Sequence, residues 1–456
     1  MTWNQLRHFH KEQDVISLWL TLFRPALRWL TPGRRHLFLS LGAIVVVIRL
    51  PLRNFGRFQQ SLGFEWSATG AVLLIVSLLG FVFLCYLAAR NIGSLPSFVR
   101  RHPQICLHAV LWTVLLVTWM GWPQNLAAQT FLVGAVFALP SLLWRIGYMM
   151  FTAQRGKMGG TRFTDHLFYI YPIWGGTDTP YGKGFDYLSV NEARDESTLA
   201  KSQLAGIKLF LLAALWMIGK GILAGVIFWE DNFVSRTFGH SLVRVPRLGN
   251  LFANPAGYPL WLSWVALYLE LIWAVLSLAV TGHLIIGWLR FFGFNVFRNT
   301  YKPLLAESVV EFWNRYYYYF KELLVNFFFY PTFTRYFKTF PRLRIFAAVF
   351  MAAFVGNVYY HWLGLDAALG TANFTAMWAG LQSRFFYCFW LATGIYVSML
   401  REQTRAKEKR VRGPLRRIVA ILGVWTFFSV IHIWAKKDPA PFFQRTQFFL
   451  GLLGWR

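Results

Sequence analysis

The sequence EFWNRYYYYFKELLVNFFFYP, from Glu311 to Pro331, sets charged, amide and aromatic side chains together in a chain that is otherwise strongly apolar. It belongs to a longer stretch, 281–361, which opens with a hydrophobic segment and closes on His361 in GNVYYHW. Each polar group placed in hydrocarbon costs free energy unless it is buried in protein or in contact with water. The stretch therefore predicts a protein-walled site at membrane depth rather than an ordinary span.

The composition is that of an integral membrane protein. The 456 residues are 56% hydrophobic and 19% aromatic, and the mean hydropathy is +0.42, far from the values of a soluble domain. The formal net charge of +27 comes mainly from Lys and Arg in loops between apolar runs, which argues against nucleic-acid binding. The three cysteines lie in apolar stretches without ligand spacing, so we predict neither a metal site nor disulfides.

Long apolar runs predict an all-α, polytopic fold. A span needs about 20 apolar residues, and on this measure we expect about nine spans. They lie near 36–52, 67–89, 105–122, 127–150, 204–229, 258–288, 343–363, 376–400 and 416–434. Loops rich in Lys and Arg alternate with loops that lack them, which predicts a cytoplasmic N-terminus and, with an odd number of spans, an extracytoplasmic C-terminus. We expect a multi-pass protein of the cell inner (cytoplasmic) membrane. Before its first span, we expect a helix over 15–30 that lies in the membrane interface.

Two segments on the predicted cytoplasmic side are too long and too hydrophobic to be plain loops. The first, 163–188, has a centre rich in Gly and Pro that does not make a straight helix, and the second is the aromatic stretch 311–331. Irregular hydrophobic segments persist at membrane depth only when they are buried in protein or line a wet cavity. We expect both to re-enter the membrane around a central funnel, the alternative being interfacial helices anchored by Tyr and Trp.

His361 is the main candidate for chemistry. A histidine buried near the end of a span can act as a general base near neutral pH, taking a proton from a hydroxyl as its oxygen attacks an acyl carbon. The alternative is a packed histidine that is hydrogen-bonded to a neighbour. The residues that precede His361 favour the first interpretation.

Those residues resemble the membrane-bound O-acyltransferase (MBOAT) family, closest to its bacterial polysaccharide or alginate O-acetyltransferase-like branch. The matching positions are Ile286, Gly287, Gly293, Phe294, Asn299 to Pro303, Ser308, Phe312, Trp313, Arg315, Pro331 and His361. A re-entrant segment of the family looks similar to 172–186, so the resemblance covers roughly 165–365. It implies helices around a funnel in which an acyl group passes from a thioester to a hydroxyl.

The chain departs from the family at one position, where Tyr317 replaces the first catalytic His or Asn. A tyrosine can donate a hydrogen bond to a developing oxyanion, but its pKa near 10 makes it a poor base at pH 7. On one continuous helix, Asn314, Tyr317 and Lys321 would share a face and could together polarise a carbonyl. We predict three catalytic residues, His361, Tyr317 and Asn314, and three residues that orient the site, His283, Lys321 and Asn326. For each of these, a hydrogen bond that merely holds two helices together is the alternative.

A basic collar follows the aromatic stretch on the predicted cytoplasmic side. It consists of Arg335, Lys338, Arg342 and Arg344. Such a collar could hold the phosphates of coenzyme A or dock an acyl-carrier protein, and topological positive charge beside anionic lipid is the alternative. Elsewhere, Glu270 in one span and Lys208 and Lys220 in another predict an ion pair between spans.

The resemblance, together with His361, implies an acyltransferase that moves an acyl group, expected to be acetyl, from a cytoplasmic thioester to an extracytoplasmic polysaccharide or a relay protein. The donor would be acyl-CoA or an acyl-carrier-protein thioester, with no cofactor bound permanently. Expected partners are membrane lipid, an acyl-carrier protein and an extracytoplasmic relay or glycan-processing protein. A non-catalytic scaffold or conduit of the same fold, favoured by Tyr317, and a transporter or flippase are the alternatives.

The same observations divide the chain into four consecutive regions. They are an interfacial N-terminal helix (1–35), N-terminal transmembrane helices (36–160), an acyltransferase-like core with re-entrant segments (161–365), and C-terminal transmembrane helices with a tail (366–456).

Overall fold

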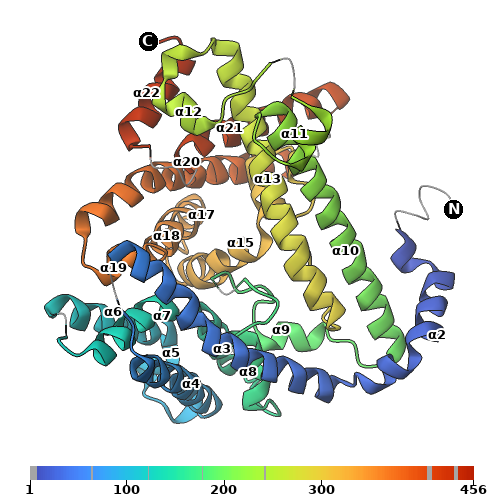
Figure 1. The fold of residues 1–456 in the computed structure, drawn as a ribbon, viewed down its shortest axis with the longest axis vertical. Helices are drawn as coiled ribbons and strands as arrows, with labels where there is room; N and C mark the ends of the chain where they lie inside the picture. The colour runs from blue at the N-terminus through green and yellow to red at the C-terminus, as the bar shows by residue number, and fades with distance from the viewer. Residues whose placement is uncertain are drawn as a thin grey trace. The chain divides into compact units, whose positions relative to one another are not determined.

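The computed structural model describes residues 8–62, 65–121, 123–176, 178–240, 243–407, 413–435 and 440–455, and only the backbone of 50–62 and 405–407. Within these ranges the protein is helical, and its one extended pairing is an isolated antiparallel bridge between Glu192 and Phe294 (Figure 1). The chain forms two compact units. Unit 1 comprises Met1–Leu209, Ile285–Phe297 and Leu363–Phe374, and unit 2 comprises Phe210–Leu284, Arg298–Trp362 and Thr375–Arg456.

Seven helices in the described part of the chain are long and apolar enough to cross a membrane. They are α4 (Ala68–Arg90), α6 (Pro103–Met120), α7 (Leu126–Gln154), α10 with its π-helical end η3 (Glu196–Ile227), α13 (Leu260–Phe291), the run α17–η7–α18 (Pro341–Leu363) and α21 (Pro414–Ala435). Each overlaps a span predicted from the sequence. The other two predicted spans are also helical, in α3 (Pro32–Leu62) and α20 (Phe374–Lys407), but are not among the seven. The total of nine therefore stays a prediction.

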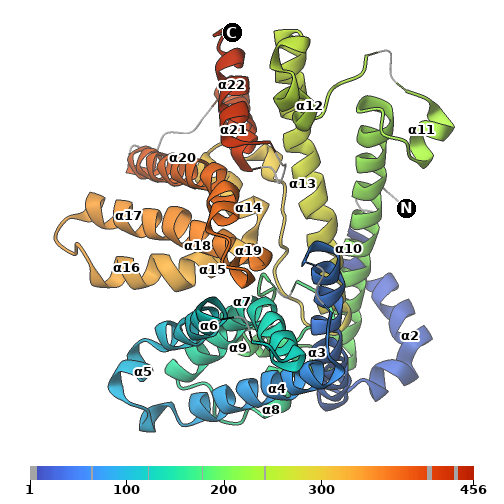
Figure 2. The same ribbon diagram turned by 60° about the vertical axis from the view of Figure 1, so that its left-hand side comes forward.

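Unit 1 is built around the pairing of α4 with α7 (Figure 2). The two helices approach closely because small residues face the contact: a Cβ at Gly134 would lie 2.0 Å from the Leu74 side chain. α7 also packs on α6, and α3 packs on α8. The shorter helices of unit 1 are α2 (Gln13–Trp29), α5 (Ser97–Arg101), α8 (Phe163–Ile170), α9 (Phe185–Val190) and α19 (Asp366–Gly370). α2 confirms a helix over most of 15–30, while its place in the interface stays a prediction.

The segment between α8 and α9 is irregular, as predicted, because α8 ends two residues before Pro172. Arg145, completely buried in α7, fastens this segment. Its guanidinium donates hydrogen bonds to three backbone carbonyls, those of Tyr169, Gly176 and Thr179. Gly176 has a φ of +71°, and a Cβ there would lie 2.4 Å from the Tyr181 ring, so this turn requires glycine.

Unit 2 contains the aromatic stretch as a broken helical run that folds back on itself. The run consists of α14 (Val309–Tyr316), α15 (Tyr318–Leu324), the π-helical η6 (Val325–Phe329) and α16 (Tyr330–Arg335), followed by α17 (Pro341–Phe350), the π-helical η7 (Met351–Gly356) and α18 (Asn357–Leu363). α16 packs on α17 and η6 on η7. Gly356 permits this contact, because a Cβ there would lie 2.6 Å from the Phe328 ring.

Two further helices of unit 2, α12 (Leu248–Ala253) and α22 (Phe442–Leu452), join α13 and α21 around a second core, a cluster that includes Phe252, Leu267, Trp434 and Phe448. The short helix α11 (Phe233–Phe238) packs on η3 instead. Glu270, completely buried in α13, pairs with Arg247, whose Nε lies 2.7 Å from Glu270 Oε1. Lys220 lies over the Trp273 ring at 4.5 Å. Arg247, in the loop before α12, is thus an ion-pair partner of Glu270 that the hydrophobic pattern did not indicate.

Candidate functional site

The aromatic stretch is interrupted at Tyr317. α14 ends at Tyr316, Tyr317 has φ −136° and ψ 74°, and α15 begins at Tyr318. The prediction that Asn314, Tyr317 and Lys321 share the face of one continuous helix is therefore wrong. The helix breaks at Tyr317 because a segment distant in the sequence contacts it there, and helical spacing alone does not reveal such a contact.

That segment is 299–301, which clamps the interruption from both sides. The Asn299 carbonyl accepts a hydrogen bond from the Tyr318 N–H at 3.0 Å, and Asn299 Oδ1 accepts one from the Tyr319 N–H at 3.3 Å. The Thr300 hydroxyl donates to the Tyr316 carbonyl at 3.0 Å. Since a helix end leaves backbone groups without partners, these bonds stabilise the break and fix the position of Tyr317.

The break separates the residues that were expected to act together. Asn314 is exposed on α14. Lys321 pairs with Glu322 and lies 4.8 Å from the Tyr318 ring centroid. Asn314 is therefore removed from the candidate site, whereas Tyr317 is partly buried and stays in it.

Tyr317 and His361 share a neighbour, Phe320. The ring centroid of Phe320 lies 5.3 Å from that of Tyr317 and 6.4 Å from that of His361. Phe320 is buried, with 4% of its surface exposed, and also contacts the Tyr360 ring at 4.7 Å. The two predicted catalytic residues, 44 positions apart in the sequence, are thus brought to one aromatic side chain by the packing of α15 and α18.

Asn357 adds a polar group that the sequence analysis missed. It is completely buried, and in the described part of the chain neither Nδ2 nor Oδ1 of its amide has a hydrogen-bond partner. Asn357 precedes His361 by four residues in α18, so both side chains lie on one face of that helix. A buried polar group without a partner costs roughly 1–3 kcal/mol, and such groups require an explanation. The i, i+4 spacing in GNVYYHW was the available signal.

Both helical runs that meet here contain a π-helical turn. Asn326 lies in η6, where its Nδ2 donates to the Glu322 carbonyl at 2.7 Å, and η7 ends directly before Asn357. π-helical turns rotate the residues that follow them and are frequent at functional sites. Here the turn in η7 sets the orientation of the face that carries Asn357 and His361.

The other predicted site residues have structural partners or lie at the surface. His283 is buried in α13, and its Nδ1 contacts the Ala279 carbonyl one turn earlier. In the basic collar, Arg344 donates to the Phe333 carbonyl and lies 3.9 Å from the Phe333 ring centroid, so it fastens α17 to α16. The exposed members of the collar are Arg335, Lys338 and Arg342.

Several residues that carry the family resemblance have a structural role. Ser308 caps α14 by accepting a hydrogen bond from the Glu311 N–H at 3.2 Å. Phe312 is completely buried and stacks on Phe428 with ring centroids 3.8 Å apart. These residues hold α14 in place and thereby position the Tyr317 interruption.

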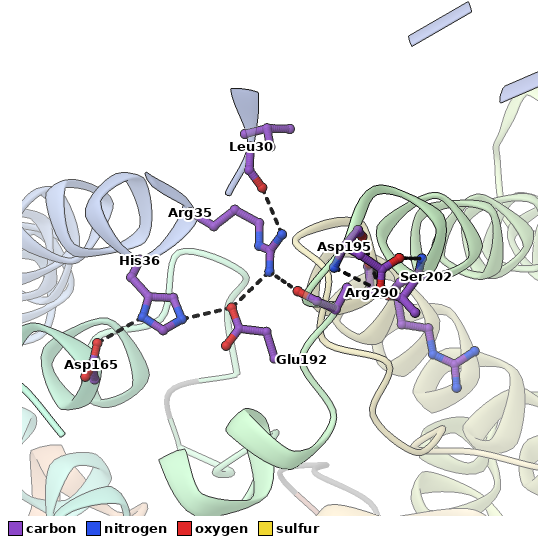
Figure 3. Close-up of polar contacts among 10 residues, drawn as sticks. Leu30, Arg35, His36, Asp165, Glu192, Asp195, Ser202 and Arg290 are labelled. Carbon is purple, nitrogen blue, oxygen red and sulfur yellow. Dashed lines mark hydrogen bonds and ion pairs between the residues drawn. The ribbon is translucent and has the colours of Figure 1, made fainter. Parts of the chain in front are cut away.

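A second polar cluster lies in unit 1 and was not predicted (Figure 3). His36 of α3 contacts Asp165 through Nδ1 at 2.9 Å and Glu192 through Nε2 at 3.0 Å. Glu192 also accepts a hydrogen bond from Arg35 at 3.0 Å. Because a carboxylate only accepts hydrogen bonds, both ring nitrogens of His36 carry hydrogen, and the ring is an imidazolium. The cluster therefore has two positive and two negative charges.

The two carboxyl groups of this cluster are held ionised. Burial alone would raise the pKa of Asp165, but hydrogen bonds from His36 and the Arg162 N–H outweigh it and lower that pKa. Burial would likewise raise the pKa of Glu192, but the hydrogen bonds and charges of His36 and Arg35 lower it. The cluster joins α3, α8 and the segment after α9, and we interpret it as a structural tie.

No metal site accompanies either cluster: the described residues contain no group of three or more His, Cys, Asp or Glu that could hold an ion. Cys85, Cys106 and Cys388 are free thiols. A scan of the chain against models of known protein families finds no match, and a search of curated proteins finds none either. Function is therefore argued from the residues themselves.

Proposed function

We propose that the protein is a membrane O-acyltransferase of the MBOAT type, with His361 as the general base. The observation that carries the proposal is the face of α18 on which the buried, unpartnered amide of Asn357 lies one turn from His361. A polar group in an apolar span is costly and is by default a functional-site hypothesis. Acyl transfer needs both a base and a hydrogen-bond donor, and this face supplies the two together.

The proposed reaction begins when His361 removes the proton from an acceptor hydroxyl. The hydroxyl oxygen attacks the carbonyl carbon of the thioester, and a tetrahedral oxyanion forms. The amide N–H of Asn357 and the phenol of Tyr317 donate hydrogen bonds to it. The C–S bond then breaks, the departing thiolate takes the proton from the His361 imidazolium, and the acyl ester leaves.

The donor would be acyl-CoA or an acyl-carrier protein on the cytoplasmic side, and the acceptor an extracytoplasmic polysaccharide or a relay protein. The exposed cations Arg335, Lys338 and Arg342 support an anionic donor. Arg344 has a structural partner in Phe333, so we no longer assign it to donor binding. An aromatic environment that excludes water would protect the thioester from hydrolysis.

A non-catalytic scaffold of the same fold is the second candidate, and Tyr317 favours it. The family places His or Asn at this position, and a tyrosine does not serve as a base at neutral pH. In this case the protein would hold an envelope-modifying complex together without transferring the acyl group itself. The Tyr317 variants described in the Discussion distinguish the two functions.

A substitution at His361 tests the proposal in cells. With His361→Ala, the O-acyl content of the envelope polymers is expected to fall to background while the protein level in the membrane stays normal. The matched control is His240→Ala, an exposed histidine of unit 2 whose ring contacts the Gly225 carbonyl and the Trp229 ring, and this variant should leave acylation unchanged. Unchanged acylation with His361→Ala at normal protein levels would refute the role of His361.

A further inference from the structure

A surface hollow of about 540 Å³ lies in unit 1 at the end of α4. Its wall on one side is the last two turns of α4, and on the other side the segment 160–163, which leads into α8. The proposed acyl transfer does not use these residues. The volume is within the usual range of a small-molecule site, about 300–1,000 Å³.

The base of the hollow is held by aromatic packing and hydrogen bonds. Tyr86 is buried, and its hydroxyl donates to the Thr161 carbonyl at 3.0 Å. The Phe163 ring packs edge-on against Phe83, with centroids 5.2 Å apart, and against Tyr86, at 5.6 Å. The hollow is therefore formed by packed side chains rather than by loose ones. Gly160, with a φ of +80° and open space where a Cβ would be, leaves its rim uncovered.

The charge of the hollow comes from Arg90 and Arg162, both exposed. Within the described residues, no carboxylate forms a salt bridge with either arginine. Arg90 Nη1 donates a hydrogen bond to the Tyr86 hydroxyl at 3.5 Å. His166, behind the hollow, contacts the Thr161 hydroxyl through Nε2 at 3.1 Å. Burial lowers the pKa of His166 to about 4, so its ring is neutral at pH 7. The two guanidinium groups are therefore the cations of this site.

Next to the two arginines, the surface of α4 that lines the hollow is apolar. α4 is one of the candidate spans, and its exposed side chains near the hollow include Phe83, Leu84 and Leu87, of which Leu84 is 65% exposed. Arg90 lies at the end of the same helix. The site thus combines positive charge at the end of a span with hydrocarbon-compatible surface along it. This order of charge and apolar surface matches the order of headgroup and acyl chains in a lipid.

We propose that this hollow binds the phosphate-bearing headgroup of an anionic phospholipid, whose acyl chains lie along α4. Arginine forms bidentate hydrogen bonds with phosphate oxygens, and Arg90 and Arg162 face one hollow from two segments. Arg90, Arg100, Arg101 and Arg162 all lie on the side predicted to be cytoplasmic, where anionic lipid gathers.

Native mass spectrometry of the full-length protein in detergent tests this site. The probe is phosphatidylglycerol, titrated against phosphatidylcholine, inorganic phosphate and coenzyme A. The wild type is expected to retain phosphatidylglycerol in preference to phosphatidylcholine. The double variant Arg90→Gln/Arg162→Gln is expected to weaken phosphatidylglycerol binding about tenfold or more, while the matched variant Arg100→Gln/Arg101→Gln, which removes two exposed charges outside the hollow, retains it.

A second variant keeps the test decisive if the double variant does not fold. Leu87→Glu leaves both arginines in place but puts a carboxylate into the hollow, so it should also weaken phosphatidylglycerol binding. Equal losses in the hollow and control variants would overturn the proposal, because binding would then depend only on net charge. Preference for inorganic phosphate or coenzyme A over the lipid would also overturn it. None of these results depends on acyl transfer, so the proposed function stands or falls separately.

Discussion

The ring of Phe320 lies 6.4 Å from the ring of His361, and this contact with α18 also brings Tyr317 close to the predicted base. Phe320→Leu keeps an apolar side chain but removes the aromatic surface between these residues. We expect acyl transfer to fall about tenfold or more, because small displacements of reacting groups are costly, with destabilisation of about 1 kcal/mol.

Phe252→Leu is the control for Phe320. Phe252 is also buried but packs on Phe448 in the second core of unit 2, with ring centroids 5.6 Å apart, so its variant should lose similar stability and keep most of its activity. Thermal unfolding in detergent and an acyl-transfer assay measure the two properties. Equal loss of activity in both variants would show that general packing, and not the position of His361, was measured.

Asn357→Leu separates a functional amide from a structural one. Because neither amide atom of Asn357 has a hydrogen-bond partner in the described part of the chain, an apolar side chain of similar shape should leave stability within about 1 kcal/mol of the wild type. Acyl transfer is expected to fall about 100-fold, as it does on loss of an oxyanion donor. The measurement is a comparison of melting temperature with turnover.

Asn299→Leu provides the contrast, since Asn299 Oδ1 accepts from the Tyr319 N–H. Its loss leaves a buried donor unsatisfied and should destabilise the protein by roughly 1–3 kcal/mol. If Asn357→Leu instead destabilised the protein as much as Asn299→Leu does, the amide of Asn357 would be a structural group.

Substitutions at Tyr317 distinguish an enzyme from a scaffold. In an enzyme, Tyr317→Phe removes a donor to the oxyanion and should reduce turnover, whereas Tyr317→His introduces a potential general base at this position and should retain or raise it. In a scaffold, neither variant has acyl-transfer activity and complex assembly is unaffected. Turnover and co-purification of partners, measured on the same preparations, decide between them.

Acid should weaken unit 1 through Asp165 and Glu192. Their pKa values are lowered in the folded protein, so they stabilise it above the pKa values of the unfolded chain. That contribution is lost progressively as the pH falls below about 5. Asp165→Asn/Glu192→Gln should destabilise the protein at pH 7 by roughly 3 kcal/mol and make the melting temperature less dependent on pH in this range.

Asp231→Asn is the control for this prediction, because it removes an exposed carboxylate paired with Arg236. Exposed pairs contribute little, so its melting curve should follow that of the wild type. An unchanged acid dependence in the double variant would mean that other groups govern acid stability.

The sequence predicts helices well where apolar residues continue over the length of a membrane span. Long apolar runs indicated all seven candidate spans, and the break of α8 before Pro172 follows from local sterics. The interruption at Tyr317 was missed because it depends on Asn299, a partner that helical spacing does not reveal. The cluster of His36, Asp165 and Glu192 was missed for the same reason. His36 lies 129 positions from Asp165 and 156 positions from Glu192 along the chain, so no local pattern connects them.

The roles of the predicted site residues stay predictions, and the structure gives their positions. His361 and Tyr317 share the neighbour Phe320, whereas Asn314 is exposed and Asn357 lies one turn from His361 in α18. An isolated asparagine in an apolar run has no distinctive sequence signal. Its burial, and the lack of a partner within the described residues, become visible only when the chain is folded.

The most direct test of the central claim is acyl transfer by the purified protein in lipid vesicles. The donor is an isotope-labelled acetyl thioester, the acceptor a hydroxyl-bearing glycan, and the labelled ester is the measured product. We predict ester formation by the wild type and a loss of about 10²- to 10⁴-fold with His361→Ala. Equal ester formation by both proteins would contradict the assignment of His361, and no ester with either protein, together with glycan or lipid flux without a donor, would contradict acyl transfer itself.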